Sequence, residues 1–582
     1  MKKSLLYRLF PYFKEEKLSF FYSIITVLFV TVFQLGRPYF MRKIIDNAIV
    51  GGNRDIIFFY SGMFLLFLIL GAITSYIQVL ITSKLGIRVV NSVKNRVFSH
   101  IMTLGMSFFD KNQSGKLMSR VESDVEQLKV IFTNSAIMLF SSVIVLIGIL
   151  CIITYEQPYL GAIIFLSLPF IFVVFYYYLT LLRKIWINVR KKNSEISGYI
   201  AEYVRGIPLI QLFLAQDKVY NKLEEYSQKK FNLENKAMFY DNFVFWSFFS
   251  FFSESASMIL ILWYGINGIY NGTMTVGTLI MFGELMRQFF WPMRNLMMVV
   301  NQINVSLGAC ERIFDVLDTK TDVKDIDFNY EKIQLKDKIL FDNISFKYEN
   351  DYILKDFSLE IKKGEQIAVI GPSGSGKTTL INLLLRFYDC NNGDIYIDNV
   401  NIKNISILGL REKIALVLQE VNLFPGTIME NLKAFNDEIK DERVIQAAIE
   451  LGSIEFIEKL EKGFYTELSE DGKNLSMGER QLISFTRAFV RNPDILILDE
   501  ATSSIDTITE KYIQQALFKL IKDRTSIIIA HRLSTIENSD RIIVMENGNI
   551  VEAGNHSKLI KNNGLYSKLY NIQKTKPLKE NN

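Results

Sequence analysis

The chain has 582 residues, of which 49% are hydrophobic and 22% charged, a composition that excludes a disordered or collagen-like polymer. Its net charge of +5 would suit a nucleic-acid-binding protein, but it also suits a membrane protein with basic cytoplasmic loops. The three cysteines lie far apart and show no C-x-x-C spacing, which argues against a disulfide framework and against a zinc site.

Charged and apolar residues are segregated along the chain, because long uncharged runs occur only before about residue 300. A membrane-spanning helix needs about 20 apolar residues, so runs at 18–36, 56–83, 130–155 and 157–182 predict four spans. Two more are expected within 242–300, separated by a turn at 267–272. The basic residues of 84–129 and 183–236 place these connections, both termini and everything after residue 300 in the cytoplasm.

A phosphate-binding loop is predicted after a short β-branched strand that begins at Ile367, where G-x-x-x-x-G-K-T is followed by an apolar helical start. The glycines let successive N–H groups point at phosphate oxygens, and the helix N-terminus adds a favourable dipole. Lys377 is expected at the β/γ-phosphates, Thr378 at Mg²⁺ and Thr379 at the inner phosphates. The other predicted loop residues are Gly371, Ser373, Gly374, Ser375 and Gly376.

A second strand, DILILDE at 494–500, ends in two carboxylates. Acidic residues at the end of a strand usually have only a structural role there. When the strand follows a phosphate-binding loop in the sequence, however, the two carboxylates are typical of a nucleotide hydrolase. Asp499 is predicted to hold Mg²⁺, directly or through water. Glu500 is predicted to accept a proton from the attacking water as the general base.

Between these elements lies LSMGERQ at 475–481, and here the sequence resembles the ATP-binding cassette (ABC) transporters, whose signature motif occupies this place. The resemblance implies that Tyr348 stacks on adenine, that Gln419 contacts Mg²⁺ and water, and that His531 contacts the γ-phosphate. Residues 107–125 and 203–213 resemble the two cytoplasmic coupling segments of exporter-type half-transporters. The implied fold is an all-α six-helix transmembrane domain followed by an α/β P-loop NTPase, and the implied working form is a dimer.

The signature departs from the family's LSGGQ pattern, because Met477 replaces a glycine and Glu479 replaces the glutamine. Ser476 and Gly478, which the resemblance places on the partner's ATP together with residue 479, are retained. A carboxylate at Glu479 adds negative charge near a triphosphate, which predicts weak binding or hydrolysis at that site. Heterodimers of this family often pair a chain that has intact catalytic residues and an atypical signature with a chain that shows the reverse. A heterodimer is therefore favoured here, and a homodimer stays open.

These features predict a transmembrane domain at 1–310, a linker at 311–335, an ABC cassette at 336–573 and a polar tail at 574–582. The expected function is ATP-driven export of an amphipathic or hydrophobic drug, lipid or peptide across the cell membrane, with ATP and Mg²⁺ bound and no nucleic acid. An exporter-shaped importer and a nucleotide-switched membrane regulator are the alternatives. Glu284 and Arg287 are spaced to form an ion pair, either on the translocation pathway or as a structural pair.

Overall fold

The computed structural model describes residues 8, 11, 16–51, 54–131, 135–247, 251–325, 334–499, 507–529 and 533–575. The chain divides into two compact units. The first comprises Met1–Met102 and Ser114–Thr319, and the second comprises Thr103–Gln113 and Lys320–Asn582. Helices followed by an α/β unit are the predicted order.

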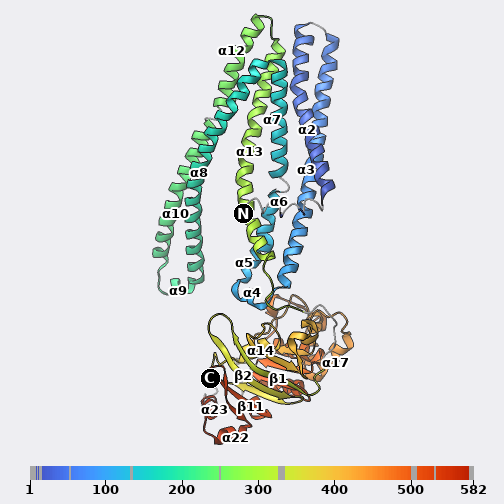
Figure 1. Cartoon of the computed structure of the whole chain (residues 1–582), viewed down its shortest axis with the longest axis vertical. Coiled ribbons are helices and arrows are strands. Elements are labelled where there is room, and N and C mark those ends of the chain that lie inside the picture. The colour runs from blue at the N-terminus through green and yellow to red at the C-terminus, as the bar shows by residue number, and fades with distance from the viewer. Residues whose placement is uncertain are drawn as a thin grey trace. The chain divides into compact units, whose positions relative to one another are not determined.

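The first unit is helical. Its α-helices are α2 (Lys17–Lys43), α3 (Arg54–Met102), α5 (Ser114–Ser119), α6 (Val125–Val130), α7 (Ala136–Glu156), α8 (Pro158–Arg205), α9 (Ile207–Leu212), α10 (Gln216–Met238), α12 (Ser257–Tyr270) and α13 (Val276–Leu317). Among the described residues, the π-helical segments η1 (Ile44–Val50), η2 (Arg120–Asp124), η4 (Phe239–Trp246) and η5 (Phe251–Ala256) interrupt or extend these helices. Figure 1 shows α2 beside α3 and α8 beside α10.

Three helical stretches in the described part of the chain are long and apolar enough to cross a membrane: Lys17–Asn47, Ile56–Met102 and Ile137–Glu156. Pro158–Phe170 and Met258–Tyr270 are shorter apolar helices. The expected turn at 267–272 begins later than predicted, because α12 continues through Tyr270. α13 then starts where the Thr275 hydroxyl accepts a hydrogen bond from the N–H of Thr278 at 3.2 Å, a helix cap.

The core of the first unit contains three methionines of α13. Met281, Met286 and Met293 are 1%, 7% and 2% exposed and pack with Phe282 and Phe289. The sequence leaves open whether such methionines line an adaptable cavity or pack between helices. For these three side chains the structure shows packing, as expected for a flexible thioether that fills gaps between helices.

The second unit contains a six-stranded sheet in the order β12-β11-β3-β10-β9-β6, a four-stranded sheet in the order β2-β1-β4-β5, and the two-stranded pair β7-β8. The strands are β1 (Lys338–Lys347), β2 (Tyr352–Lys362), β3 (Gln366–Ile370), β4 (Asn392–Ile397), β5 (Val400–Asn401), β6 (Ile414–Val417), β7 (Gly426–Thr427), β8 (Glu467–Leu468), β9 (Ile495–Asp499), β10 (Thr525–Ile529), β11 (Arg541–Glu546) and β12 (Asn549–Gly554).

Short helices surround these sheets. They are α4 (Met106–Lys111), α14 (Lys377–Leu384), α15 (Ile407–Glu412), α16 (Ile428–Lys433), α17 (Asp441–Leu451), α18 (Ile454–Ile457), α19 (Met477–Val490), α20 (Thr507–Ile521), α21 (Leu533–Glu537), α22 (His556–Lys561) and α23 (Leu565–Thr575), with 3₁₀ turns η6 (Ile402–Asn404), η7 (Gly463–Tyr465) and η8 (Glu470–Gly472).

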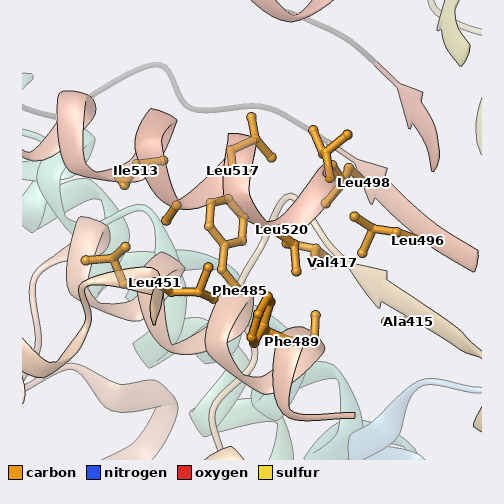
Figure 2. Close-up of a cluster of buried hydrophobic side chains, with 14 of the residues drawn as sticks. Ala415, Val417, Leu451, Phe485, Phe489, Leu496, Leu498, Ile513, Leu517 and Leu520 are labelled. Atoms are coloured by element: carbon orange, nitrogen blue, oxygen red, sulfur yellow. The ribbon is translucent and has the colours of Figure 1, made fainter. Parts of the chain in front are cut away.

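One hydrophobic core connects α17, α19 and α20 to the central strands. Figure 2 shows the rings of Phe485 and Phe489, from α19, among side chains of α20 and of strands β6 and β9. The central strands read as continuous apolar runs because both faces of a parallel sheet are covered. This packing fixes α19, which carries the predicted signature residues, against the strands that carry the predicted metal-binding residues.

Candidate nucleotide-binding site

The predicted nucleotide-binding residues converge because β3, β10, β9 and β6 run parallel. In the ladders, Ile529 at the end of β10 lies beside Val369 on one side and Asp499 on the other. The carboxyl ends of these strands therefore meet at one edge of the sheet, which is where open α/β sheets bind ligands. The phosphate-binding loop follows β3 at this edge, and Gln419 follows β6 there with an exposed side chain.

The phosphate-binding loop has the backbone that the sequence predicts. Gly374 and Gly376 have φ values of +80° and +100°, which side chains other than glycine rarely allow. Gly371 has a different constraint, since a Cβ there would overlap the backbone carbonyl oxygen of Met545. Ser373 is exposed and Ser375 is 2% exposed.

Lys377 points back into this loop. Its Nζ donates to the carbonyl oxygens of Gly371 and Pro372, both at 2.9 Å, and lies 3.4 Å from the Ser375 hydroxyl. Burial lowers the pKa of the Lys377 ammonium, and the nearby Asp499 carboxylate partly opposes this. The ammonium is therefore held where phosphate oxygens could replace the loop carbonyls as its acceptors.

Tyr348, the predicted adenine partner, follows β1 directly and is 39% exposed. Its hydroxyl lies 3.4 Å from the Thr379 hydroxyl and accepts a hydrogen bond from the Asn382 amide at 3.2 Å. Both partners belong to α14, which begins within the phosphate-binding loop. Asn382 is a site residue that was not predicted from the sequence, although its spacing of three residues from Thr379 places both side chains on one helix face.

Three predicted metal-binding residues supply the oxygen atoms that Mg²⁺ prefers. The Thr378 hydroxyl and the Gln419 amide belong to exposed residues, whereas Asp499 is half-buried at the end of β9. These groups fit a magnesium ion that is shared with phosphate oxygens, because Mg²⁺ in nucleotide sites is held by few protein ligands. The predicted catalytic residues Glu500 and His531 lie outside the described residues.

The signature residues form a helix cap. Ser476 precedes α19, and its hydroxyl accepts a hydrogen bond from the N–H of Glu479 at 3.3 Å. In return, the Glu479 carboxylate accepts from the N–H of Ser476 at 2.8 Å, which completes a capping box. This cap was not predicted from the sequence, although S-x-x-E before an apolar run is the signal for it. Gly478 is buried within the first turn, and Met477 is 43% exposed.

Comparisons with known proteins agree with this geometry. A family model described as the ABC transporter transmembrane region matches residues 20–293, and a model described as ABC transporter matches residues 354–503. Bacillus subtilis (strain 168) has a protein named uncharacterized ABC transporter ATP-binding protein YknV that is 35% identical over 575 residues, covering 98% of this chain and 94% of that protein. An ATP-dependent lipid A-core flippase of Desulfotalea psychrophila is 32% identical, covering 98% of this chain and 99% of the flippase.

The solved structure of a bacterial Atm1-family ABC exporter with ATP bound superposes with a TM-score of 0.78 at 26% sequence identity, covering 96% of this chain and 98% of that one. The predicted fold class, helical transmembrane region followed by cassette, is thereby confirmed. One polypeptide thus contains the phosphate-binding loop, the acid at the end of β9 and the apolar helices. The chain belongs to the ABC transporter family, as an ATPase of the exporter type.

Proposed function

We propose that this chain is one half of a dimeric exporter that uses ATP to move an amphipathic or hydrophobic drug, lipid or peptide across the cell membrane. The observation that carries the proposal is the sheet edge at which the loop after β3 lies two strands away from Asp499, in the same chain as membrane-spanning helices. We further propose that the cassette and both termini face the cytoplasm, because the basic residues gather in the connections that would lie there.

At the nucleotide site, the loop N–H groups and Lys377 bind the phosphates, and Tyr348 stacks on the base. Thr378, Gln419 and Asp499 would hold Mg²⁺, which would supply positive charge beside the phosphates when bound. Glu500 accepts the proton of the attacking water, and His531 contacts the γ-phosphate. ATP closes two cassettes by binding the closed dimer more tightly than the open one, which is all that a population shift requires.

The partner is proposed to be a second, similar half-transporter chain. The Ser476–Glu479 cap brings a carboxylate to the start of α19, where the family packs its signature on the partner's ATP. A negative charge there disfavours a triphosphate, so the second chain is expected to supply the better signature. A homodimer would instead use this cap at both sites.

The cargo is proposed to be amphipathic because the transmembrane unit carries polar groups within apolar helices. Arg287 donates to Glu284 at 3.0 and 3.1 Å, so the predicted ion pair is confirmed, and Gln288 also donates to Glu284 at 3.0 Å. The Arg287 side chain is 74% exposed in the chain, as expected for a charge that faces a wet cavity or a partner. The ATP-dependent lipid A-core flippase that resembles this chain is named for a lipid.

The domain limits 1–310, 311–335, 336–573 and 574–582 are also a proposal. α13 is continuous to Leu317, so this helix runs through the start of the proposed linker, and the two compact units divide between Thr319 and Lys320.

The test is transport by the complex purified with a tag on this chain and reconstituted into vesicles. ATP-dependent movement of a fluorescent amphiphile from the cassette side to the opposite side is the expected result, and Glu500→Gln should abolish it together with ATP turnover. Movement in the opposite direction would identify an importer. Unchanged turnover in Glu500→Gln would refute the catalytic assignment, and the subunit masses of the purified complex distinguish a heterodimer from a homodimer.

A further inference from the structure

Three aromatic rings, those of Phe346, Tyr348 and Tyr388, form a cluster beside the proposed base pocket in which each ring contacts the other two. Tyr348 packs perpendicular to Phe346, at 4.9 Å between ring centroids and 85° between planes. It also packs perpendicular to Tyr388, at 5.1 Å and 90°. Tyr388 lies after α14 and has no role in the site as described above. Edge-to-face rings of this kind restrain each other's orientation, because only a narrow range of angles is favourable.

The hydroxyl of Tyr388 donates a hydrogen bond to the carboxylate of Asp110, a residue 278 positions earlier in the chain. Asp110 belongs to α4, in the short segment Thr103–Gln113 that packs with the cassette rather than with the transmembrane unit. By connectivity, α4 lies between the end of α3 at Met102 and the start of α5 at Ser114. A displacement of α4 therefore acts on the ends of two helices of the transmembrane unit.

The backbone that carries Tyr388 is held rigidly. Arg386 is 3% exposed and donates to Asp389 at 3.1 Å, to the carbonyl of Ile405 at 3.1 Å and to the carbonyl of Lys324 at 2.8 Å. Arg411 donates to the carbonyls of Leu385 and Arg386, both at 3.0 Å. After Tyr388, the N–H of Asn391 donates to the carbonyl of Ser345 at 3.0 Å. Since the main chain on either side is anchored, the position of the Tyr388 hydroxyl depends on the orientation of its ring, and hence on the rings of Tyr348 and Phe346 that pack against it.

We propose that Tyr388 is a positioning residue that links the base pocket to α4: a base stacked on Tyr348 restrains that ring, Tyr388 packs edge-on against it, and the Tyr388 hydroxyl then holds Asp110. This inference rests on the proposed function, because it needs a base on Tyr348. According to this proposal, binding of the nucleobase, and not only of the phosphates, affects the transmembrane helices through α4. Burial and the bond to Asp110 raise the pKa of Tyr388, so its hydroxyl stays a donor at neutral pH.

The test is hydrogen–deuterium exchange of peptide 106–113 in the full-length transporter in nanodiscs, with Mg²⁺ and a non-hydrolysable ATP analogue. In the unmodified protein the analogue should slow exchange about fivefold, the effect of one hydrogen bond on local opening. Inorganic triphosphate, which has no base, should not slow it. Tyr388→Phe keeps the ring but removes the donor, so it should bind the analogue within about twofold of normal while losing the slowing.

Two further variants keep the test decisive. Asp110→Ala should lose the slowing as Tyr388→Phe does, whereas Asp110→Asn retains an acceptor oxygen and should preserve it. The matched control is Ser107→Ala, which removes another hydrogen bond of α4 within the second unit, from Ser107 to Asp322, without touching the rings. Ser107→Ala should raise the exchange rate of peptide 106–113 both with and without the analogue, and the analogue should still slow exchange about fivefold.

A normal response in both Tyr388→Phe and Asp110→Ala would overturn the inference. Failure of the proposed base site would look different: Tyr348→Ala would then bind the analogue as tightly as the unmodified protein. If Tyr348→Ala weakens binding while Tyr388→Phe keeps the full response, the base site stands and only the link to α4 is refuted.

Discussion

The guanidinium Nη1 of Arg42 lies 2.5 Å from the carboxylate Oε1 of Glu156, which joins the end of α2 to the end of α7. Arg42 also pairs with Asp46 in η1, with its Nε 3.5 Å from a carboxylate oxygen. Asp46 in turn accepts from the Thr275 hydroxyl at 2.6 Å and from the N–H of Gly277 at 2.8 Å. One polar network thus connects α2, α7 and the start of α13 at the same end of the transmembrane unit.

Removing either charge of this pair should destabilise the protein. Arg42 and Glu156 are only 20% and 23% exposed. Arg42→Gln would leave the partly buried carboxylates of Glu156 and Asp46 without their cation, whereas Glu156→Gln would leave Arg42 with Asp46 as its remaining ion-pair partner in this network. Glu156→Gln and Arg42→Gln should each lower the melting temperature in detergent by about 2 °C, and the double variant should lose less than their sum. The matched control is Glu225→Gln, whose pair with Lys229 is 64% and 55% exposed and should shift the melting temperature little. Strict additivity of the Arg42 and Glu156 effects would show that the two side chains do not interact.

Lys377→Ala should reduce ATP turnover by about 100-fold or more, because Lys377 is the one Lys or Arg in the loop 371–378 and we propose that its ammonium binds the phosphates. The exposed Lys363, just before β3, is the control, and Lys363→Ala should leave turnover unchanged. Phosphate release by the reconstituted complex measures both. Near-normal turnover in Lys377→Ala would contradict the assignment of this loop.

Glu479→Gln should improve the site that the signature completes. A glutamine can maintain the capping box but removes the charge that we propose lies near the partner's triphosphate. Affinity for ATP should rise severalfold with little change in stability, whereas Glu479→Ala should lose the carboxylate half of the capping box and about 0.5–1 kcal/mol of stability, since the Ser476 hydroxyl still accepts from the backbone N–H of residue 479. Equilibrium ATP binding and thermal unfolding of the two variants separate these effects, and weaker binding by Glu479→Gln would show that the carboxylate is not a penalty.

Cys390 should react slowly with alkylating reagents at neutral pH. Burial raises the pKa of its thiol to about 11, so the reactive thiolate is scarce until the solution becomes strongly alkaline. The rate of iodoacetamide labelling should therefore rise about tenfold per pH unit between pH 7 and pH 10. Mass spectrometry of the Cys390 peptide gives this rate, with the unfolded protein as the reference. A plateau near pH 9, as for an exposed thiol, would contradict the prediction.

Local features of this protein could be predicted from the sequence alone. Each of these features depends on a few consecutive residues: the apolar runs, the phosphate-binding loop whose glycines have positive φ angles, and the apolar strand that ends at Asp499. Helix periodicity, turn chemistry and burial of a short strand act over that same range, so the local sequence suffices. The Glu479 cap was equally local and could have been predicted from its S-x-x-E spacing.

Other relationships needed the tertiary structure. The order β3-β10-β9, which brings the phosphate-binding loop near Asp499, depends on which strands pair. The pairs Tyr388–Asp110 and Arg42–Glu156 join residues 278 and 114 positions apart. No local propensity selects such partners, because closing a long loop costs conformational entropy that only the packing of the whole unit offsets. The sequence by itself thus determined which chemical groups this transporter carries, and the tertiary structure decided which of them meet.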